Sequence, residues 1–594
     1  MAVARSSAAV DLAAAGLPEN QRACYARALA FSAWLSSSKT HARRAAAALD
    51  AAGRGPWPSW CAAAETLGDY ALAFDFLRTT EALGRHAREH FVERVGERMA
   101  AGIAVYPQLP QNNWSLQALS GIGILTLALW HESTPWPLCD WLEVVIDGIS
   151  RLLFGLVSSE GVYLEGPGYS RRASVGFIPF AWAYTLRCGV DLINFPSFTR
   201  WMSWLVEVLY PDGTNPPIDD SRREALHPFA LLCHRHCRQA SLFRWAADRQ
   251  RVWHEIWDLP ALLLYDDRIR PHPPVSPPHR ILERSGMAVV RSDWSPHATY
   301  GLIVARPLPP LEPGQADSAH RHDDPTNFLI YANGEPLLHD AGYGSWGHPQ
   351  RYTWFLQGEA HNLILVDGHG PPRCTYHRGD GRDPNVSTSN GRVRCLFESP
   401  DLVVVRTETD YLHVGFTRFF LFARRHYFVL LDAVDSAAVH TYDWVLHGAG
   451  ALRQLSPAGA LWRTRHSWLA VWWIAPANLR VSRHRGMHDE GQHQITLHDY
   501  VRAATTGKRV VFFTVLVPGR RNESLPSVEP LRVESPAVGV TVTHGKNTDH
   551  FVFNPWGGTL QIALPGHRAR RLRGQWGAIM EANGRLVPRG NGWA

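Results

Sequence analysis

The sequence lacks several features that define common protein classes. It has no apolar run long enough to span a membrane as a helix, and its N-terminus has no continuous apolar segment like that of a signal peptide. Its eight cysteines are sparse for 594 residues and do not resemble a disulfide framework. We therefore expect no membrane partner and a cytoplasmic location by default. A start site that hides an export signal would make the protein periplasmic or secreted.

The sequence also contains no Lys/Arg run and no recognisable nucleic-acid module, so we expect no nucleic-acid partner. Its net charge of +6 suits an anionic ligand, and an acidic polysaccharide or oligosaccharide fits best. The 24 tryptophans offer flat faces on which sugars stack, although most are expected to fill cores. A homodimer is left open as the oligomeric state.

Helical periodicity dominates residues 1–265, and a chain of this length is expected to contain at least two domains. Antiparallel helix pairs with short connections can form a bundle, a solenoid or a closed ring. A Gly-rich loop is predicted at 158–174. The predicted helical segments are 1–55, 58–105, one beginning near 114, 137–157, 175–190, 197–209, 225–240 and 241–257.

A Pro-rich linker at 266–280 separates the helical domain from an all-β domain at 281–594. The second domain is rich in Val, Phe, Tyr and Thr runs bounded by Gly, Pro, Asn and Asp, without intervening helices, which predicts a large antiparallel sandwich. The predicted strand segments are 298–306, 327–334, 362–368, 402–436, 441–448, 467–475, 509–518, 538–545, 550–555 and 560–566.

The stretch 317–368 holds the densest group of ligand-type residues, namely His320, His322, Asp340 and His361. In extended backbone, alternate side chains share a face, so His320 and His322 point the same way. Both imidazoles can bind a metal ion, or one can bind it while the other faces a substrate. Histidine and carboxylate ligands suit zinc. The alternative is that these histidines simply face solvent.

Residues 160–172, within this predicted loop, are a second candidate. Its glycines let the backbone approach a ligand closely, and they flank the polar residues Glu165 and Tyr169. Arg171 and Arg172 can attract a carboxylate. The alternative is an ordinary helix–helix turn anchored by the tyrosine.

Two further segments have structural interpretations. In QNNW, at 111–114, Asn112 or Asn113 either caps the following helix or hydrogen-bonds a substrate carboxylate. The segment PDGTNPPIDDS, at 211–221, is interpreted as a turn-rich loop in which Asp220 and Ser221 cap the next helix.

Four segments taken in order resemble the heparinase II/III-like proteins. They are NNW at a helix start, EGVYLEGPGY, AHRHDDPTNFLIYANGEPLLHDAGYG and EAHNLILVDG. This family includes lyases acting on heparin, heparan sulfate and alginate. The resemblance implies an α+β multidomain fold, with an incomplete (α/α) toroid followed by an antiparallel β-sandwich and a cleft between them.

The resemblance also implies catalytic roles. Tyr169 matches the family's catalytic tyrosine, and His320 matches the catalytic first histidine of the HxH motif. Asn113, or as second choice Asn112, matches the asparagine that neutralises the uronate carboxylate. Glu165 matches an acidic residue beside the tyrosine.

The same resemblance makes His322, Asp340 and His361 the ligands of a structural zinc ion. Characterised lyases often carry a histidine beside the carboxylate-neutralising asparagine, where this sequence has Trp114. That departure points to a different sugar. With Asn112, Arg171 and Arg172, Trp114 completes the predicted substrate-binding group.

The implied reaction is β-elimination at a 4-linked uronic acid. Tyr169 acts as base and acid, or His320 is the base and Tyr169 the acid. An unperturbed tyrosine has a pKa near 10, so a tyrosine base needs a neighbouring positive charge. The alternatives are a zinc-dependent hydrolase, a non-catalytic carbohydrate-binding protein and a polysaccharide-biosynthesis accessory protein.

Overall fold

The computed structural model describes residues 17–55, 57, 60–108, 110–224, 227–250, 258–275, 277–308, 320–372, 387–491, 494–564, 569–582, 585–590 and 592–593. The chain divides into two compact units, which we call the helical unit and the β unit. The helical unit comprises Met1–Leu205, Leu226–His272 and Glu312–Ala316. The β unit comprises Val206–Ala225, Pro273–Leu311 and Asp317–Ala594. The boundaries predicted at 265 and 280 stay a prediction.

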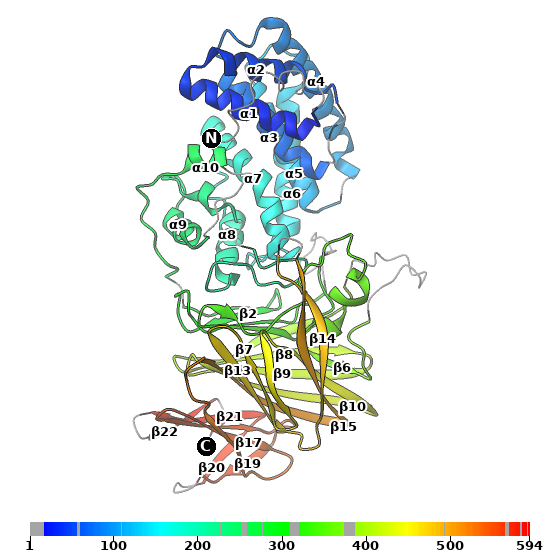
Figure 1. Ribbon diagram of the computed structural model, residues 1–594, viewed down its shortest axis with the longest axis vertical. Coiled ribbons are helices and arrows are strands. Elements are labelled where there is room, and N and C mark those ends of the chain that lie inside the picture. Colours follow the sequence, from blue (N-terminus) through cyan, green and yellow to red (C-terminus); the bar gives the residue numbers. More distant parts are fainter. Residues whose placement is uncertain are drawn as a thin grey trace. The chain divides into compact units, whose positions relative to one another are not determined.

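Helices follow one another almost without interruption through the first part of the chain, coloured blue to green in Figure 1. None of the described helices has both the length and the apolarity that crossing a bilayer requires. The helices are α1 (Glu19–Ser36), α2 (Lys39–Asp50), α3 (Trp60–Leu77), α4 (Arg85–Val105), η3 (Tyr106–Gln108), α5 (Asn113–Leu129), α6 (Leu138–Leu156), α7 (Gly166–Cys188), α8 (Pro196–Val208), η4 (Pro228–Leu232), α9 (Ala240–Arg249) and α10 (Asp258–Leu264).

Helix α5 is the centre of the helical unit. It is apolar on all sides, and a helix of that kind must be enclosed by others. It packs against α3, α4, α6 and α7. The absence of a side chain at Gly123 permits the close approach of α7, because a Cβ there would lie 2.5 Å from the ring of Phe180. This packing fixes the position of the first turn of α5, where Asn113 lies.

Two local predictions in the helical unit are wrong. The loop predicted at 158–174 ends early, because α7 begins at Gly166 with a proline in its first turn, where proline favours a helix start. The helix predicted at 225–240 is a short 3₁₀ turn, η4, followed by bends. Here the Asn194 side chain takes the backbone partners that a helix would use, donating to His236 O and accepting from Arg238 N. Of the helix predicted at 241–257, residues 251–257 lie outside the described part.

Antiparallel strands build the β unit. A five-stranded sheet contains β1 (Arg280–Leu282), β2 (Met287–Arg291), β3 (Tyr300–Val304), β4 (Asn327–Ala332) and β5 (Glu335–Pro336). A ten-stranded sheet contains β6 (Ile364–Val366), β7 (Gly391–Ser399), β8 (Leu402–Tyr411), β9 (Val414–Ala423), β10 (Tyr427–His447), β11 (Ala451–Ser456), β12 (Gly459–Arg463), β13 (Ser467–Ala475), β14 (Arg480–Asp489) and β15 (Ile495–Arg520).

The last part of the chain adds two smaller sheets. One contains β16 (Ser527–Leu531), β17 (Val538–His544), β18 (Asn547–Phe553), β21 (Trp576–Ala582) and β22 (Arg585–Arg589). The other pairs β19 (Thr559–Ile562) with β20 (Arg570–Arg573). Every predicted strand segment overlaps an observed strand. The strands that were not predicted are β1, β2, β5, β7, β11, β12, β14, β16, β20, β21 and β22.

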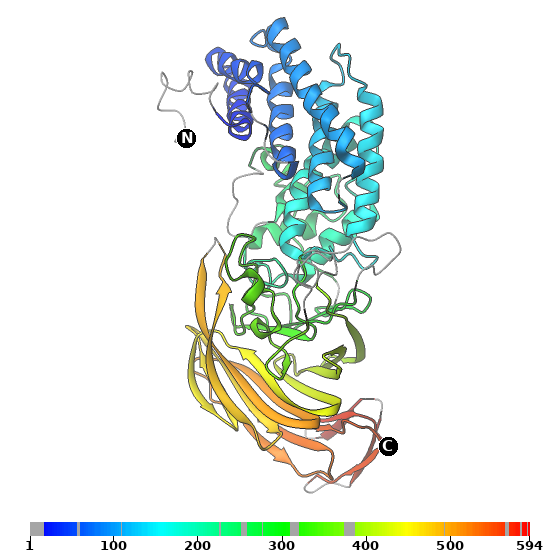
Figure 2. The same ribbon diagram turned by 90° about the vertical axis from the view of Figure 1, so that its right-hand side faces the viewer.

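The ten-stranded sheet is the middle layer of the β unit and is strongly curved (Figure 2). On one face, Leu421 and Val429 share a buried core with Val540 and Phe551 of the C-terminal sheet. On the other face, the ring of Phe328 on β4 packs against that of Phe420. The predicted fold class is confirmed, with helices first and an antiparallel sandwich after them.

The segment 206–225 belongs to the β unit although it follows the helices in sequence. Tyr300 on β3 donates a hydrogen bond to Val208 O, at 2.8 Å, and Arg291 on β2 donates to Leu209 O, at 3.2 Å. These bonds hold the segment against the five-stranded sheet. Asp220 lies farther along it, within the same unit as the HRH residues.

Candidate active site and metal centre

Asp220 holds both histidines of the HRH motif. His320 Nδ1 lies 2.8 Å from Asp220 Oδ2, and His322 Nε2 lies 3.2 Å from Oδ1. A backbone bond from Asp220 N to His320 O joins the two segments at 3.1 Å. The predicted common face of His320 and His322 is therefore present, because both rings reach one carboxylate.

Arg351 completes the environment of Asp220. Its two terminal nitrogens each lie 2.8 Å from one Asp220 oxygen, in the bidentate geometry that a guanidinium favours. Burial alone would raise the pKa of the Asp220 carboxyl, but the hydrogen bonds from the two histidines and the charge of Arg351 hold it well below its usual value. Asp220 is therefore ionised and can only accept hydrogen bonds.

This geometry decides which ring nitrogen of His320 is basic. Since the ionised Asp220 accepts, His320 donates its Nδ1 proton, and Nε2 keeps the lone pair. The ring lies edge-on to Trp346, with centroids 5.7 Å apart. Trp346 is 41% exposed and stacks under the guanidinium of Arg351, whose Cζ lies 4.4 Å from the ring centroid. A basic imidazole nitrogen beside an exposed aromatic face is an arrangement that could serve sugar chemistry.

His322, Asp340 and His361 form a buried group that can hold a metal ion. One ligand atom from each lies within 4.8 Å of the others. Because His322 donates Nε2–H to Asp220, its Nδ1 carries a lone pair. His322 Nδ1 and His361 Nε2 are both buried with no hydrogen-bond partner among the described residues. Two orphaned imidazole nitrogens beside a carboxylate fit the donor set of zinc.

Neighbouring polar groups hydrogen-bond to Asp340 and so orient it, as groups around a metal site commonly orient its ligands. Asn327 Nδ2 donates to Asp340 Oδ2 at 2.5 Å, and Gly342 N donates to Oδ1 at 3.2 Å. Burial lowers the pKa of His361 on its own, but the adjacent Asp340 charge outweighs it and raises the pKa. His361 thus carries a positive charge next to the Asp340 carboxylate, and a metal cation would replace the proton on the His361 ring.

In the helical unit, Asn113 is the first residue of α5, and it is tied to Glu165. Asn113 N lies 3.0 Å from Glu165 Oε2, and Asn113 Nδ2 lies 3.4 Å from Oε1. Tyr163 donates to the same carboxylate at 2.9 Å, and Gln117 donates to Asn113 Oδ1 at 3.2 Å. Glu165 therefore occupies the positive end of α5 and orients the Asn113 amide.

The neighbours of Asn113 differ from it. Asn112 is the N-cap of α5, and its side-chain oxygen accepts from Trp114 N at 3.1 Å and from Ser115 N at 3.3 Å. This cap occupies Asn112 Oδ1, whereas the ring of Trp114 is 53% exposed. The Trp114 ring is thus open to a ligand, whereas Asn113 is buried.

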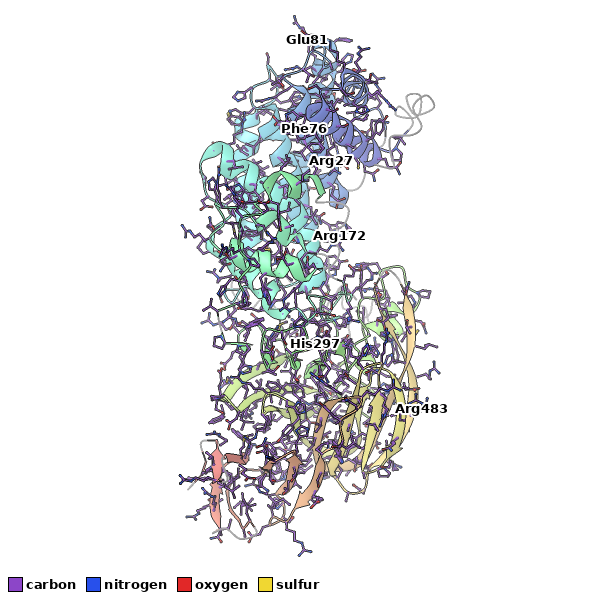
Figure 3. The ribbon with its side chains drawn as sticks, turned by 60° about the vertical axis from the view of Figure 1, so that its left-hand side comes forward. Arg27, Phe76, Glu81, Arg172, His297 and Arg483 are labelled. Carbon is purple, nitrogen blue, oxygen red and sulfur yellow. The ribbon has the colours of Figure 1, made fainter. Side chains whose placement is uncertain are left out.

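Tyr169, Arg171 and Arg172 lie on the first two turns of α7 instead of in a loop. Arg172 is half exposed and pairs with Glu65 on α3, with Nη1 and Oε1 3.6 Å apart. Figure 3 labels Arg172 and Arg27 along the same side of the helical unit. Tyr169 is partly buried near the positive end of α7. Because Tyr169 lies on the first turn of a helix, its backbone conformation is fixed, as that of a loop residue would not be.

Sequence reasoning missed Asp220, Arg351 and Trp346. It interpreted Asp220 and Ser221 as a helix cap, but no helix begins beside them in the part of the chain that the structure describes. The available signal was the adjacent pair Asp219–Asp220 in a Gly/Pro-rich segment, which is an unusual place to bury two acids. Both are buried, and Asp219 pairs with Arg306.

Part of the β unit matches a known protein family. Residues 277–530 match the family model described as "Heparinase II/III-like, C-terminal". The β unit contains a heparinase II/III-like domain. This domain includes the HRH stretch, Asp340, Arg351 and His361. No curated protein sequence matches the chain.

Several solved structures share the fold. One described as "Heparinase III-BT4657 gene product" superposes with a TM-score of 0.67 at 14% identity, covering 96% of this chain and 83% of that one. Heparan sulfate lyase HepC from Pedobacter heparinus gives 0.65 at 14% identity, with 96% and 82% covered. A structure described as heparinase III gives 0.67 at 12% identity, with 95% and 81% covered. The likeness extends over both the helical part and the heparinase II/III-like domain.

Proposed function

We propose that this protein is a polysaccharide lyase that cleaves a uronic-acid-containing acidic polysaccharide by β-elimination. The observation that carries the proposal is the contact of His320 with the buried Asp220–Arg351 pair, within the heparinase II/III-like domain. Two of the structures sharing the fold are described as heparinase III and heparan sulfate lyase, which supports an acidic polysaccharide as the substrate class.

Elimination requires removal of a weakly acidic C5 proton and departure of the O4 group. His320 would accept the proton at Nε2, and Asp220 would stabilise the imidazolium that forms. Tyr169 would protonate the leaving oxygen. If the proton and the leaving group lie on one face of the sugar, Tyr169 would perform both transfers.

Charge that develops on the uronate carboxylate must be stabilised, and this is commonly the largest catalytic contribution. Asn113 would donate to the carboxylate through the Nδ2 hydrogen that does not face Glu165. Arg171 and Arg172 would attract the anionic chain, and Trp114 and Trp346 would stack on its sugars. The Asn112 side chain would keep the first turn of α5 in place.

We further propose that His322, Asp340 and His361 bind one structural zinc ion. When bound, the ion supplies a fixed positive charge that braces the HRH segment, and it does not activate water. In metal analysis of purified protein, His361→Ala should contain one equivalent of zinc less than the wild type. Well-folded protein that retains its stability with no zinc would contradict this assignment.

The decisive experiment is incubation with a panel of uronate-containing polysaccharides, followed by ultraviolet absorbance of the new C4=C5 double bond. The wild type should produce unsaturated ends, and Tyr169→Phe and His320→Ala should each abolish them. His413→Asn, which changes an exposed histidine on a tight turn, serves as the control.

Other outcomes separate the alternatives. Degradation that yields only saturated ends would identify a hydrolase. Sugar binding with no product would identify a carbohydrate-binding or biosynthesis accessory protein. Full activity in Tyr169→Phe would remove that residue from the mechanism.

A further inference from the structure

A second group of histidines lies in the β unit, outside the site described above. His339, His488 and Glu490 each bring one ligand atom within 4.8 Å of the others. His339 precedes the metal-site residue Asp340, but its surroundings are different. Its ring stacks on that of His488, with centroids 3.7 Å apart, and lies 5.0 Å from that of His498.

A chain of hydrogen bonds fixes the protons on these rings. His447 Nε2 lies 2.9 Å from the backbone oxygen of Glu359, which can only accept, so His447 donates there. His447 Nδ1 then carries the lone pair, and His498 Nε2 donates to it at 2.7 Å. Burial lowers the pKa of both rings, which keeps them neutral.

The same logic continues to His488. His498 Nδ1 carries a lone pair and lies 3.0 Å from His488 Nδ1, which must therefore donate. On the other side of the ring, His488 Nε2 lies 2.5 Å from Glu490 Oε1. This is the distance of a charge-assisted hydrogen bond, and a divalent cation bound by both groups would replace the proton that such a bond shares.

We propose that His339, His488 and Glu490 bind a divalent cation of the zinc type, at a second site separate from the His322–Asp340–His361 group. Two imidazoles and one carboxylate form a recognised zinc donor set, with a fourth position left for water. Glu490 is exposed, so the ion can be reached from solvent and the carboxylate can rotate to accommodate it.

The site would fasten the end of an edge strand. β14, which ends at Asp489, pairs with β15 and with no other strand of the described chain. An ion between His488 and His339 would fasten the end of β14 to the segment around Asp340. Two hydrogen bonds already hold this end of β14. Asp489 N donates to Ala341 O at 2.9 Å, and Arg222 Nε lies 2.8 Å from Asp489 Oδ2.

The test uses the full-length protein, stripped with a chelator and titrated with Zn²⁺ and, for its visible absorption, with Co²⁺. The expected result is that Glu490→Gln and His488→Ala each lose one equivalent that Asp340→Asn retains. His498→Phe keeps all three ligands but removes the proton acceptor of His488, and it should weaken this site by about 10- to 100-fold. His413→Asn should bind as the wild type does.

Circular dichroism and thermal unfolding check that each variant is folded. Glu490 is exposed and its replacement by glutamine is nearly isosteric, so this variant tests the site even if His488→Ala does not fold. The proposal is overturned if Glu490→Gln and His488→Ala bind as much metal as the wild type. In that case a proton held between His488 and Glu490 accounts for their contact. Loss of the equivalent that Asp340→Asn removes would concern only the first metal site.

Discussion

The candidate residues of the two units are held in different ways. In the β unit, His320 belongs to a buried network of ions centred on Asp220 and Arg351. In the helical unit, Asn113 and Tyr169 lie near the starts of α5 and α7. Glu165 is the carboxylate that orients Asn113. The β unit thus fixes His320 through paired charges, whereas the helical unit relies on helix ends and neutral donors.

This difference predicts how substitutions in each unit affect stability and activity. A buried ion pair that loses one partner leaves the other charge without compensation, so changes near His320 should affect stability and activity together. A helix start loses one hydrogen bond at a time, so changes near Asn113 should mainly affect kinetics. Four measurements test this comparison.

The largest effect is expected for Asp220→Asn. The amide places an NH₂ group opposite the donors of His320 or Arg351, so lyase activity should fall by about 10³- to 10⁴-fold, as expected when a histidine loses its orienting carboxylate. The free energy of unfolding should fall by about 3–5 kcal/mol. The assays are the rate of double-bond formation and urea unfolding.

A matched control is Asp549→Asn in the C-terminal sheet. Asp549 is buried, pairs with Arg424 and accepts from Tyr427 at 2.8 Å. It should lose stability and keep its rate at temperatures where it is folded. Equal losses of rate in both variants would mean that Asp220 acts only through stability.

The second effect depends on pH. The folded-state pKa of Asp220 is lowered, so its contribution to stability is present above the ordinary aspartate pKa of about 4 and is lost as the pH falls below it. The difference in unfolding free energy between wild type and Asp220→Asn should thus be largest near pH 7 and shrink below about pH 4. A difference that stays constant down to about pH 3 would show that the carboxylate charge is not what stabilises the network.

A smaller effect is expected for Glu165→Gln in the helical unit. A hydrogen bond to a charged group contributes about 1.5–3 kcal/mol, so kcat/KM should fall by about 10- to 100-fold with a modest change in stability. Tyr163→Phe removes one donor to Glu165 but keeps the bonds to Asn113, so its kcat/KM should fall less. If the two variants lose equally, Glu165 does not act through Asn113.

The smallest effect is expected for Asn112→Ala. Loss of an N-cap costs about 1 kcal/mol, and Asn112→Ser should recover most of it because serine also caps. Neither change should alter KM if Asn112 only caps the helix. A raised KM in the serine variant would establish the substrate contact that the family resemblance implies.

Much of the architecture could be predicted from the sequence. The change of period near residue 280 indicated helices followed by sheets, and the strand segments were placed correctly because β-rich runs are bounded by turn residues. The start of α7 was misplaced because the Gly-rich segment masked the helix-favouring proline in its first turn. The helix at 225–240 was wrong because a distant residue, Asn194, satisfies its backbone.

The sequence by itself determined the order of helix and sheet and the common face of His320 and His322, and it predicted His322, Asp340 and His361 as metal ligands. These follow from local periodicity and from residue type. Only the tertiary structure decided that Asp220 binds both histidines across about 100 positions of sequence and that Arg351 neutralises it. It alone also brought His339 against His488. Such pairings depend on which distant segments the folded sheets bring together. Local sequence patterns do not specify contacts between residues so far apart in the chain.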